Sequence, residues 1–425
     1  MDLGVEHLAT ALQDQPEVRA SILAAIAKVY QDLDMMDEAL PLSREVLALN
    51  QALYGQASRQ ARDSMGILAR LHGVRGEYDD AGDLHRRRLD LARMARPVDA
   101  AEVADAEIRI GRNLLNTSEA QAAEEHFLAA VDLAEANGLA REHVDALRSV
   151  ADTQRQLGKL EESERNARRT VELTDLVRGE NTAAAAFARG TLASTLSSLR
   201  KYDEAETYFR QAIDLLSETL GPEHGNTLTT HSNLARMYLN SGDFEAAAEQ
   251  AGMAVKIGER TLGPSHPAVG RYLQNYSKAL ESLGRTAEAV AAFERTAQIF
   301  RDTLPLSSYQ RATPLLSLSG IHLAQNRPVR AEAVASEALE ILTVALPEGH
   351  AITGVADCRM GRSLMAQGRL EEAEFHLQRS TESLLDSNSF PAYREECLTA
   401  AAEFHRARGS DETVNRLEAA LSATN

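Results

Sequence analysis

Tryptophan is absent from this sequence of 425 residues, and aromatic residues as a whole make up only 4% of it. A core built around large aromatic side chains is therefore not expected. The sequence also lacks a run of about eighteen apolar residues, which a membrane-spanning helix requires. Its N-terminus has no basic start followed by an apolar stretch, so no secretory signal is expected either. These absences favour a cytoplasmic protein that does not bind a membrane by this chain alone.

Cysteine is nearly absent as well. The only two cysteines, Cys358 and Cys397, do not have the CxxC spacing of a paired-thiol site. Two cysteines cannot form the disulfide framework of a small secreted domain. We therefore expect two separate, ordinary thiols in a reducing compartment.

The motifs of common catalytic sites are also missing. The sequence has no glycine-rich phosphate loop, HRD or DFG motif of a kinase, and no Walker loop. HExxH, GxSxG, paired CxxC and EF-hand motifs do not occur either. We therefore expect a protein that is not an enzyme and that uses no cofactor and no metal.

Acidic side chains outnumber basic ones by 63 to 45, which gives a formal net charge of −18 at pH 7. Such a charge makes nucleic acid and anionic membranes poor partners, because both attract basic proteins. Alanine, leucine, glutamate and arginine are abundant, and 44% of the residues are hydrophobic. This composition is typical of a folded, mainly helical protein.

An internal repeat runs through the chain. One register places a turn residue every 40 to 42 positions, at Asp34, Gly76, Ser118, Gly158, Arg200, Gly242, Gly284, Asn326, Gly368 and Gly409. A second series of helix-ending residues follows each of the first nine turns, at Gly55, Pro97, Gly138, Gly179, Gly221, Gly263, Pro305, Pro347 and Pro391. Apolar residues recur at helical spacing between these positions, so each unit reads as helix, turn, helix and linker.

Small residues recur in the first helix of each unit, where a bulky side chain would hold two helices apart. The column comprises Ala27, Ala69, Gly111, Ala151, Ala193, Ala235, Ser277, Ser319 and Gly361. With the turn glycine, the alanine five residues later and the aromatic position beyond it, the pattern of "NLARMYLNSGDFEAAAEQ" (233–250) resembles the tetratricopeptide repeat. The 42-residue period and the linkers "LGPEHG" and "LGPSHP" resemble the kinesin-light-chain subclass. This resemblance covers roughly residues 20 to 425.

The resemblance implies an all-α, right-handed solenoid of about ten helix-turn-helix units. We expect residues 1–19 to form a helical lead-in, 20–394 to form nine repeats in one solenoid, and 395–425 to form a degenerate tenth repeat that caps it. Residues 9–55 are also similar to the segment that follows the kinase and membrane helix in bacterial receptor-type serine/threonine kinases. That likeness implies a bacterial signalling context.

The stretch "TLGPEHGNTLTTHSNLARMY" (219–238) invites a reading as a metal or catalytic site, because His224 and His231 lie near a carboxylate and an asparagine. His266 and His350 occupy the linker position of His224 in other repeats. Equivalent side chains of stacked repeats are on the order of 10 Å apart, whereas zinc needs ligands at about 2 Å. We therefore expect the linker histidines to pack and to hydrogen-bond at helix ends.

Basic residues recur at the position that follows the small residue, which faces the concave groove in this architecture. The column reads Lys28, Arg70, Arg112, Asp152, Ser194, Arg236, Lys278, Gly320 and Arg362. Asn233 and Asn275 match the asparagine that grips a ligand's backbone in groove-binding members of the family, and Arg109 and Arg359 stand at the same position in other repeats. The predicted binding residues are the ten basic and asparagine side chains among these, namely Lys28, Arg70, Arg109, Arg112, Asn233, Arg236, Asn275, Lys278, Arg359 and Arg362. The alternative is a solvated helix face paired with nearby carboxylates.

Repeats five and eight break this column, with Phe187, Gly190, Ser194, Ser197 and Ser198 in one and Thr313, Leu316, Gly320 and Leu323 in the other. These small and apolar groups indicate either a pocket for a hydrophobic anchor of a ligand or a tighter stretch of the superhelix.

The sequence therefore predicts a scaffold that binds an extended, acidic protein segment in its groove. One alternative is a ligand-gated sensor module that regulates a serine/threonine kinase or another effector. Another is a structural scaffold that associates with itself as a homo-oligomer.

Overall fold

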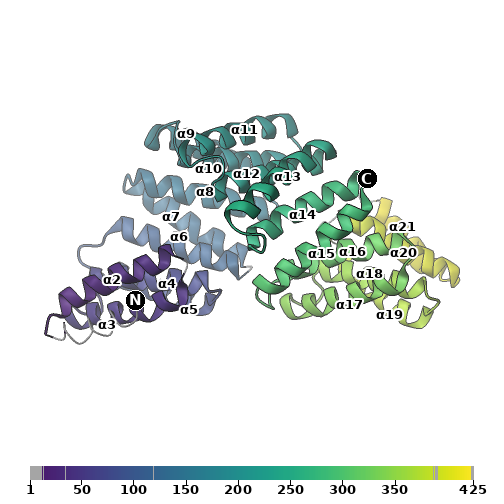
Figure 1. The fold of residues 1–425 in the computed structure, drawn as a ribbon, viewed down its shortest axis with the longest axis horizontal. Helices are drawn as coiled ribbons and strands as arrows, with labels where there is room; N and C mark the ends of the chain where they lie inside the picture. The colour runs from purple at the N-terminus through teal and green to yellow at the C-terminus, as the bar shows by residue number, and fades with distance from the viewer. Residues whose placement is uncertain are drawn as a thin grey trace. The chain divides into compact units, whose positions relative to one another are not determined.

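A computed structural model describes residues 12, 14–33, 35–117, 119–385, 387 and 391–422. This part of the chain contains twenty α-helices, one short 3-10 helix and no strand (Figure 1). The predicted all-α fold is confirmed, and the helices form ten successive pairs. The predicted turn residues Asp34 and Ser118, like most of the lead-in 1–19, lie outside the described residues.

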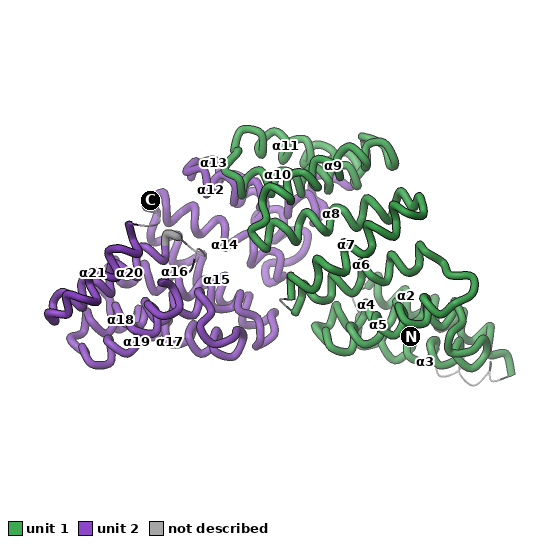
Figure 2. Tube along the Cα trace, turned by 180° about the vertical axis from the view of Figure 1, so that it is seen from behind, with its two compact units in different colours: residues 1–219 green, residues 220–425 purple. Residues whose placement is uncertain are grey.

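The chain divides into two compact units, residues 1–219 and 220–425 (Figure 2). In unit 1 the first helices of the pairs are α2 (Pro16–Asp32), α4 (Arg59–Val74), α6 (Ala100–Asn116), α8 (Ala140–Gln156) and α10 (Ala183–Ser198). The second helices are α3 (Met36–Tyr54), α5 (Tyr78–Met94), α7 (Ala120–Ala136), α9 (Leu160–Arg178) and α11 (Tyr202–Thr219).

In unit 2 the first helices are α12 (Gly225–Ser241), α14 (Pro267–Ser282), α16 (Thr313–Ala324), α18 (Ala351–Met365) and α20 (Pro391–Ala407). The second helices are α13 (Phe244–Thr261), α15 (Thr286–Thr303), α17 (Pro328–Ala345), α19 (Leu370–Leu384) and α21 (Asp411–Ser422). The 3-10 helix η1 (Tyr309–Ala312) precedes α16. The boundary expected at residue 395 falls inside α20.

Within each unit, helices next to each other in the chain pack together, and several first helices also pack on the following first helix, as α6 does on α8 and α12 on α14. Within a unit, successive first helices therefore share one side. We call the groove-facing side of the first helices, on which the predicted binding residues stand, the inner face.

The turns between paired helices adopt the left-handed backbone that their residue types indicated. Gly242 has a φ of 88°, and the same region is occupied by two residues with side chains, Arg200 (φ 60°) and Asn326 (φ 55°). At Arg200 the backbone N–H of Lys201 donates to the carbonyl of Leu196 over 2.9 Å, which satisfies a carbonyl at the helix end. The turn geometry is thus retained without glycine.

The linker histidines cap the first helices. Nδ1 of His224 accepts from the backbone N–H of Asn226 at 3.1 Å, and His266 and His350 make the equivalent bond at 3.1 and 3.3 Å. Ser58 and Thr182 cap the equivalent helix ends in unit 1. The expectation of helix-end hydrogen bonds is confirmed, since these side chains satisfy backbone donors that the helix leaves unpaired.

The small-residue column receives side chains from the second helix of the same repeat. At Gly111 an added Cβ would lie 2.6 Å from the ring of Phe127, which is fully buried. At Gly361 it would lie 2.8 Å from Leu377. The small residue therefore sets how closely the two helices of a repeat approach.

A buried ion pair joins α4 to α6. Nε and Nη2 of Arg62 each donate to a different oxygen of Glu102 at 2.8 Å, and both side chains are 7% exposed. Arg62 also donates to the carbonyl of Ala57. This bidentate contact fixes the first helices of two successive repeats against each other.

The two cysteines are bonded to each other. Cys358 on α18 and Cys397 on α20 form a disulfide, with their Cα atoms 5.6 Å apart. The expectation of two separate thiols is therefore wrong. Residues 39 positions apart in the sequence meet because first helices of adjacent repeats pack side by side, which spacing along the chain does not reveal.

Repeat eight is the least regular. Its first helix α16 has 12 residues, and η1 replaces the turn before it. Leu316 is buried, and an added Cβ at Gly320 would lie 3.0 Å from the guanidinium of Arg359. Gly320 thus makes room for an arginine of the next repeat, which supports the tighter packing over an open hydrophobic pocket at this repeat.

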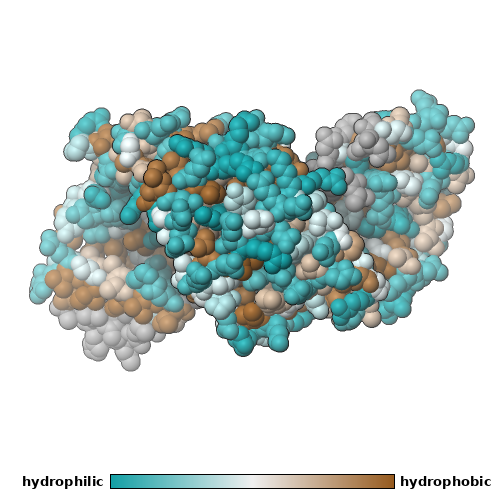
Figure 3. All heavy atoms as spheres, turned by 90° about the horizontal axis from the view of Figure 1, so that it is seen from above, coloured by the Kyte–Doolittle hydropathy of each residue, from teal (hydrophilic) through white to brown (hydrophobic). Residues whose placement is uncertain are grey.

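Exposed apolar side chains such as Leu176 and Val344 are scattered over the surface, and the face in Figure 3 is mostly hydrophilic. Single exposed apolar residues are common on protein surfaces. Among the described residues, no helix is both long enough and apolar enough to cross a bilayer.

Candidate functional site

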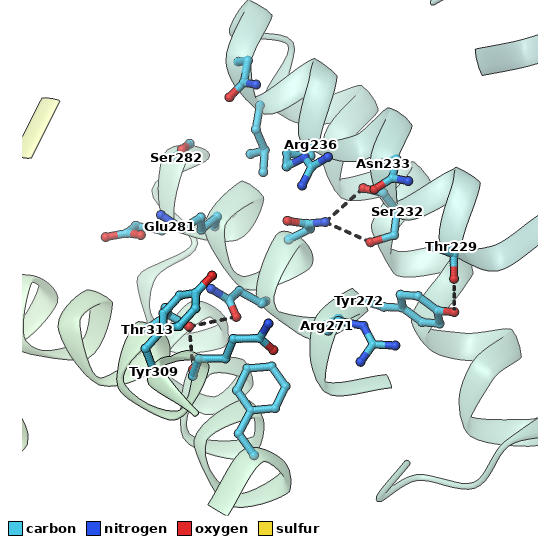
Figure 4. Close-up of a pocket in the computed structure, with 17 residues that line it drawn as sticks. Thr229, Ser232, Asn233, Arg236, Arg271, Tyr272, Glu281, Ser282, Tyr309 and Thr313 are labelled. Carbon is cyan, nitrogen blue, oxygen red and sulfur yellow. Dashed lines mark hydrogen bonds between the residues drawn. The ribbon is translucent and has the colours of Figure 1, made fainter. Parts of the chain in front are cut away.

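A cavity of about 720 Å³ opens on the inner face of unit 2, between α12, α14 and η1 (Figure 4). Ligand sites in proteins commonly measure about 300–1,000 Å³. We call this cavity the inner-face pocket. Most of its lining residues have polar side chains; they are Thr229, Ser232, Asn233, Arg236, Leu239, Asn240, Arg271, Tyr272, Gln274, Asn275, Lys278, Glu281, Ser282, Phe300, Tyr309, Gln310 and Thr313.

Four predicted binding residues meet in this pocket. Asn233 and Arg236 stand three residues apart on α12, and Asn275 and Lys278 stand three apart on α14. Residues at this spacing share one face of a helix, and α12 packs on α14. The repeat therefore brings two copies of the same two positions side by side.

The two asparagines are not equivalent. The amide nitrogen of Asn275 donates to the carbonyl and to the hydroxyl of Ser232, both at 2.9 Å, as the dashed lines in Figure 4 show. Asn233 makes no side-chain hydrogen bond to any described residue. Asn233 can therefore offer both a donor and an acceptor to a ligand's backbone, whereas Asn275 has only its carbonyl oxygen to offer.

Three cations line the pocket. Arg271 is exposed and forms no ion pair within the described chain, and it joins Arg236 and Lys278. Nζ of Lys278 lies 3.3 Å from the hydroxyl of Tyr393 and 5.6 Å from the centre of its ring. Glu281 lies at the pocket edge, where burial raises the pKa of its carboxyl against the opposing effect of Lys278. The pocket thus offers an excess of positive charge to an anionic ligand.

Arg359 and Arg362 are placed differently. Both form an ion pair with Glu396 of α20, and Arg359 is buried. Burial lowers the pKa of each guanidinium. These two predicted residues thus share one carboxylate of their own chain, which balances only one of their two charges, and such pairing is what the solvated-face alternative anticipates.

In unit 1 the predicted residues form a row along α2, α4 and α6, and Lys28 and Arg70 of this row line a small cavity of about 70 Å³. Lys28 is exposed and pairs with Asp32 on its own helix, and Arg70 lies exposed on α4. On α6, Nε of Arg109 donates to Asp105 at 3.2 Å, while Arg112 is half-buried. Although the residue is exposed overall, partial burial of the guanidinium lowers the pKa of Arg70 most, the charges of Arg109 and Arg88 lower it further, and Asp105 opposes them.

A buried histidine lies beside this row. His85 on α5 is 5% exposed, and its Nδ1 has no hydrogen-bond partner among the described residues. Burial, followed by the charges of Arg88 and Arg109, lowers the pKa of His85 to about 4, whereas Asp105 opposes the shift. The fold therefore favours the neutral imidazole.

This shift predicts a pH-dependent loss of stability. A histidine in an unfolded chain titrates near pH 6.5, so the contribution of His85 is complete above that pH and is lost as the pH falls toward 4. Between pH 7 and pH 5 we expect it to remove about 2 kcal/mol from the free energy of unfolding. In urea denaturation, the fall in the free energy of unfolding from pH 7 to pH 5 should be smaller for His85→Gln than for the original protein by about this amount. An equal loss in the variant and the original protein would contradict the assignment.

Comparison with known proteins identifies the repeat. Models of the tetratricopeptide repeat match residues 181–260 and 270–302. These segments are tetratricopeptide repeats. They cover α12, α14 and thus Asn233, Arg236, Asn275 and Lys278 of the inner-face pocket. No curated protein matches the sequence significantly.

Solved structures share the helical fold. The apo form of RapI is 13% identical, with 86% of this chain and 97% of RapI covered and a TM-score of 0.53. A tetratricopeptide repeat protein from Parabacteroides merdae is 17% identical (70% and 98% covered, TM-score 0.45). BtubC (BKLC) from P. vanneervenii is 21% identical (56% and 92% covered, TM-score 0.46). At such identities the likeness to RapI shows a common fold alone.

Three residues that lie near the predicted binding residues were not predicted. Arg271 stands seven positions before Lys278, two turns along the same face, so the helical register could have indicated it. Tyr309 lies in η1, which interrupts the repeat, and Glu396 lies on α20. No periodic signal marks these two positions.

The second histidine of the 219–238 stretch has a role within its repeat. Nδ1 of His231 lies 2.8 Å from Oε1 of Gln250, which joins the first helix to the second. His126 and His376 make similar contacts with an acidic residue of the first helix of their own repeats, at 2.6 and 2.7 Å. Elsewhere, His72, Glu77 and Asp80 lie within reach of a common ion, but His72 is hydrogen-bonded to Glu77 at 2.5 Å.

Proposed function

We propose that this chain is a non-enzymatic scaffold that binds an extended, acidic segment of a partner protein along the inner face of its first helices. The tetratricopeptide-repeat fold makes the chain a protein-interaction scaffold in the broad sense. The observation that carries the finer proposal is the inner-face pocket. There, four side chains chosen from their repeat positions line one cavity with Arg271.

The chemistry of the pocket suits such a segment. The free amide of Asn233 and the carbonyl of Asn275 can pair with the ligand's backbone, which needs both donors and acceptors. Arg236, Arg271 and Lys278 can hold acidic side chains through charge-assisted hydrogen bonds, each contributing about 1.5–3 kcal/mol. The chain as a whole is acidic and repels an acidic ligand, whereas the local excess of positive charge on the inner face attracts it. An acidic ligand is therefore expected to bind there.

The cellular setting belongs to the proposal as well. Bacterial signalling linked to a serine/threonine kinase rests on the resemblance of residues 9–55. A cytoplasmic location is proposed from the lack of apolar runs and a signal sequence. The cysteines no longer support that location, because Cys358 and Cys397 are paired.

The test is a pull-down of binding partners with the charge of the inner face reversed. We expect Arg112→Glu, Arg236→Glu and Lys278→Glu together to weaken capture of the partner at least about tenfold, because each change removes an attraction and adds a repulsion. A matched control reverses three exposed arginines of second helices, Arg210, Arg260 and Arg301, with the same change in net charge. A partner retained equally by both variants would show that the inner face does not bind it.

A further inference from the structure

Two arginines of unit 1 have no counter-ion. Arg112 on α6 and Arg148 on α8 are both half-buried, and α6 packs on α8. Neither forms an ion pair or a hydrogen bond with any residue in the described part of the chain.

The carboxylates around them are engaged by other cations. Asp105 accepts from Arg88 at 2.7 Å and from Arg109 at 3.2 Å, and Asp145 accepts from Arg178 at 2.8 Å. Asp152, also on α8, accepts from Thr191 at 3.3 Å and lies 3.8 Å from Arg155. Each of these carboxylates therefore already contacts another residue, and none of them forms an ion pair with Arg112 or Arg148.

The two guanidinium groups also lie close enough to repel each other. Burial lowers the pKa of Arg112 most, and the charges of Arg148 and Arg109 lower it further, whereas Asp145 and Asp105 oppose the shift. Repulsion between half-buried like charges disfavours the free state, so an anion that contacts both groups would relieve it.

The number of guanidinium groups indicates which kind of anion would bind to Arg112 and Arg148. A carboxylate brings one negative charge, which balances one guanidinium. A phosphate monoester brings about −1.5 to −2 at neutral pH and three acceptor oxygens, so a single group can bridge two guanidinium forks. Arg109, one turn before Arg112, uses only its Nε toward Asp105 and can supply further donors.

We infer that Arg112 and Arg148 form a binding site for a phosphate monoester, carried by a phosphorylated side chain of the bound segment. This rests on the proposed function for the peptide itself, but the phosphoryl site is a separate claim about α6 and α8. Free inorganic phosphate shares the same chemistry and is the other source of such a group.

Binding to the full chain tests the site with three mixtures of degenerate 13-residue peptides. The mixtures differ only in the fixed central residue, which is phosphoserine, serine or aspartate, and inorganic phosphate is titrated separately. We expect the phosphoserine mixture to bind at least about tenfold more tightly than the aspartate mixture. Arg112→Gln with Arg148→Gln should abolish this preference, and Arg148→Gln alone should reduce it. The matched control, Arg165→Gln with Arg169→Gln on α9, should retain it.

The outcomes separate the two claims. Equal binding of phosphoserine and aspartate mixtures, or a preference that survives in the double variant, overturns the phosphoryl site even if acidic peptides bind elsewhere on the inner face. Binding of inorganic phosphate that the double variant loses, without any peptide binding, supports the site with free phosphate as its ligand and contradicts the proposed function. Thermal denaturation should show no loss of stability in the double variant, because it removes a repulsion.

Discussion

Arg62→Met should lower the free energy of unfolding by about 3–5 kcal/mol, because it leaves the carboxylate of Glu102 buried without a hydrogen-bonded cation. The two side chains are each 7% exposed and share two hydrogen bonds of 2.8 Å. Arg88, the next cation, approaches Glu102 only to 3.9 Å. Urea denaturation followed by circular dichroism at pH 7 measures the loss.

The double variant Arg62→Met with Glu102→Met distinguishes two free energies. One is the destabilisation caused by an unpaired buried carboxylate, and the other is the net stabilisation that the ion pair provides. A buried ion pair replaced by apolar side chains of similar volume often leaves stability nearly unchanged. We therefore expect the double variant to recover most of the loss. If it is as unstable as the single variant, packing around Arg62 rather than its charge holds α4 to α6.

Phe127→Ala should cost about 3–5 kcal/mol, since it empties the space of a fully buried ring. Gly111→Ala alone should cost about 1–3 kcal/mol, because its new Cβ would meet that ring at 2.6 Å. Both changes can be measured as shifts in the urea midpoint.

Combining the two changes should restore part of the stability. In the Phe127→Ala background the methyl group added by Gly111→Ala enters the cavity instead of colliding with a ring, so this second change should become stabilising. Two other repeats already carry alanine at both positions, as Ala151 with Ala167 and Ala235 with Ala251. Gly190→Ala is the control, because nothing lies within 4 Å of its added Cβ, and it should gain about 1 kcal/mol from helix propensity. If Gly111→Ala destabilises the Phe127→Ala variant as much as it destabilises the original protein, its effect does not arise from a collision with the ring of Phe127.

The helices and turns followed from local patterns in the sequence. The turn residues Gly242 and Asn326 adopt the expected left-handed backbone because that requirement depends on residue type and close neighbours. The small-residue column was visible for the same reason, since the repeat imposes the same helix contact in each unit. Residues 1–11 and 13 of the predicted lead-in 1–19 lie outside the described part, so a helix there stays a prediction, whereas residues 16–19 begin α2.

The sequence predicted the positions of the binding residues on their helices but not the hydrogen bonds and ion pairs that they form. Periodicity placed Asn233, Arg236, Asn275 and Lys278 on one face, and the structure brings them to one pocket. Periodicity could not reveal that the amide nitrogen of Asn275 donates a hydrogen bond to Ser232, nor that Arg359 forms an ion pair with Glu396. These contacts join different repeats through side chains that do not recur, so a pattern built from recurrence carries no information about them.

Helix packing in each unit joins elements that are next or next but one in the chain. Loops closed by such contacts are short, and their closure costs little chain entropy. A molecule with this contact map should fold quickly for its length, and folding can nucleate at any repeat and spread to its neighbours. Among the described repeats, those that pack on one neighbouring repeat only should then exchange their amide hydrogens first. The C-terminal disulfide between α18 and α20 joins the last of these repeats to the one before it.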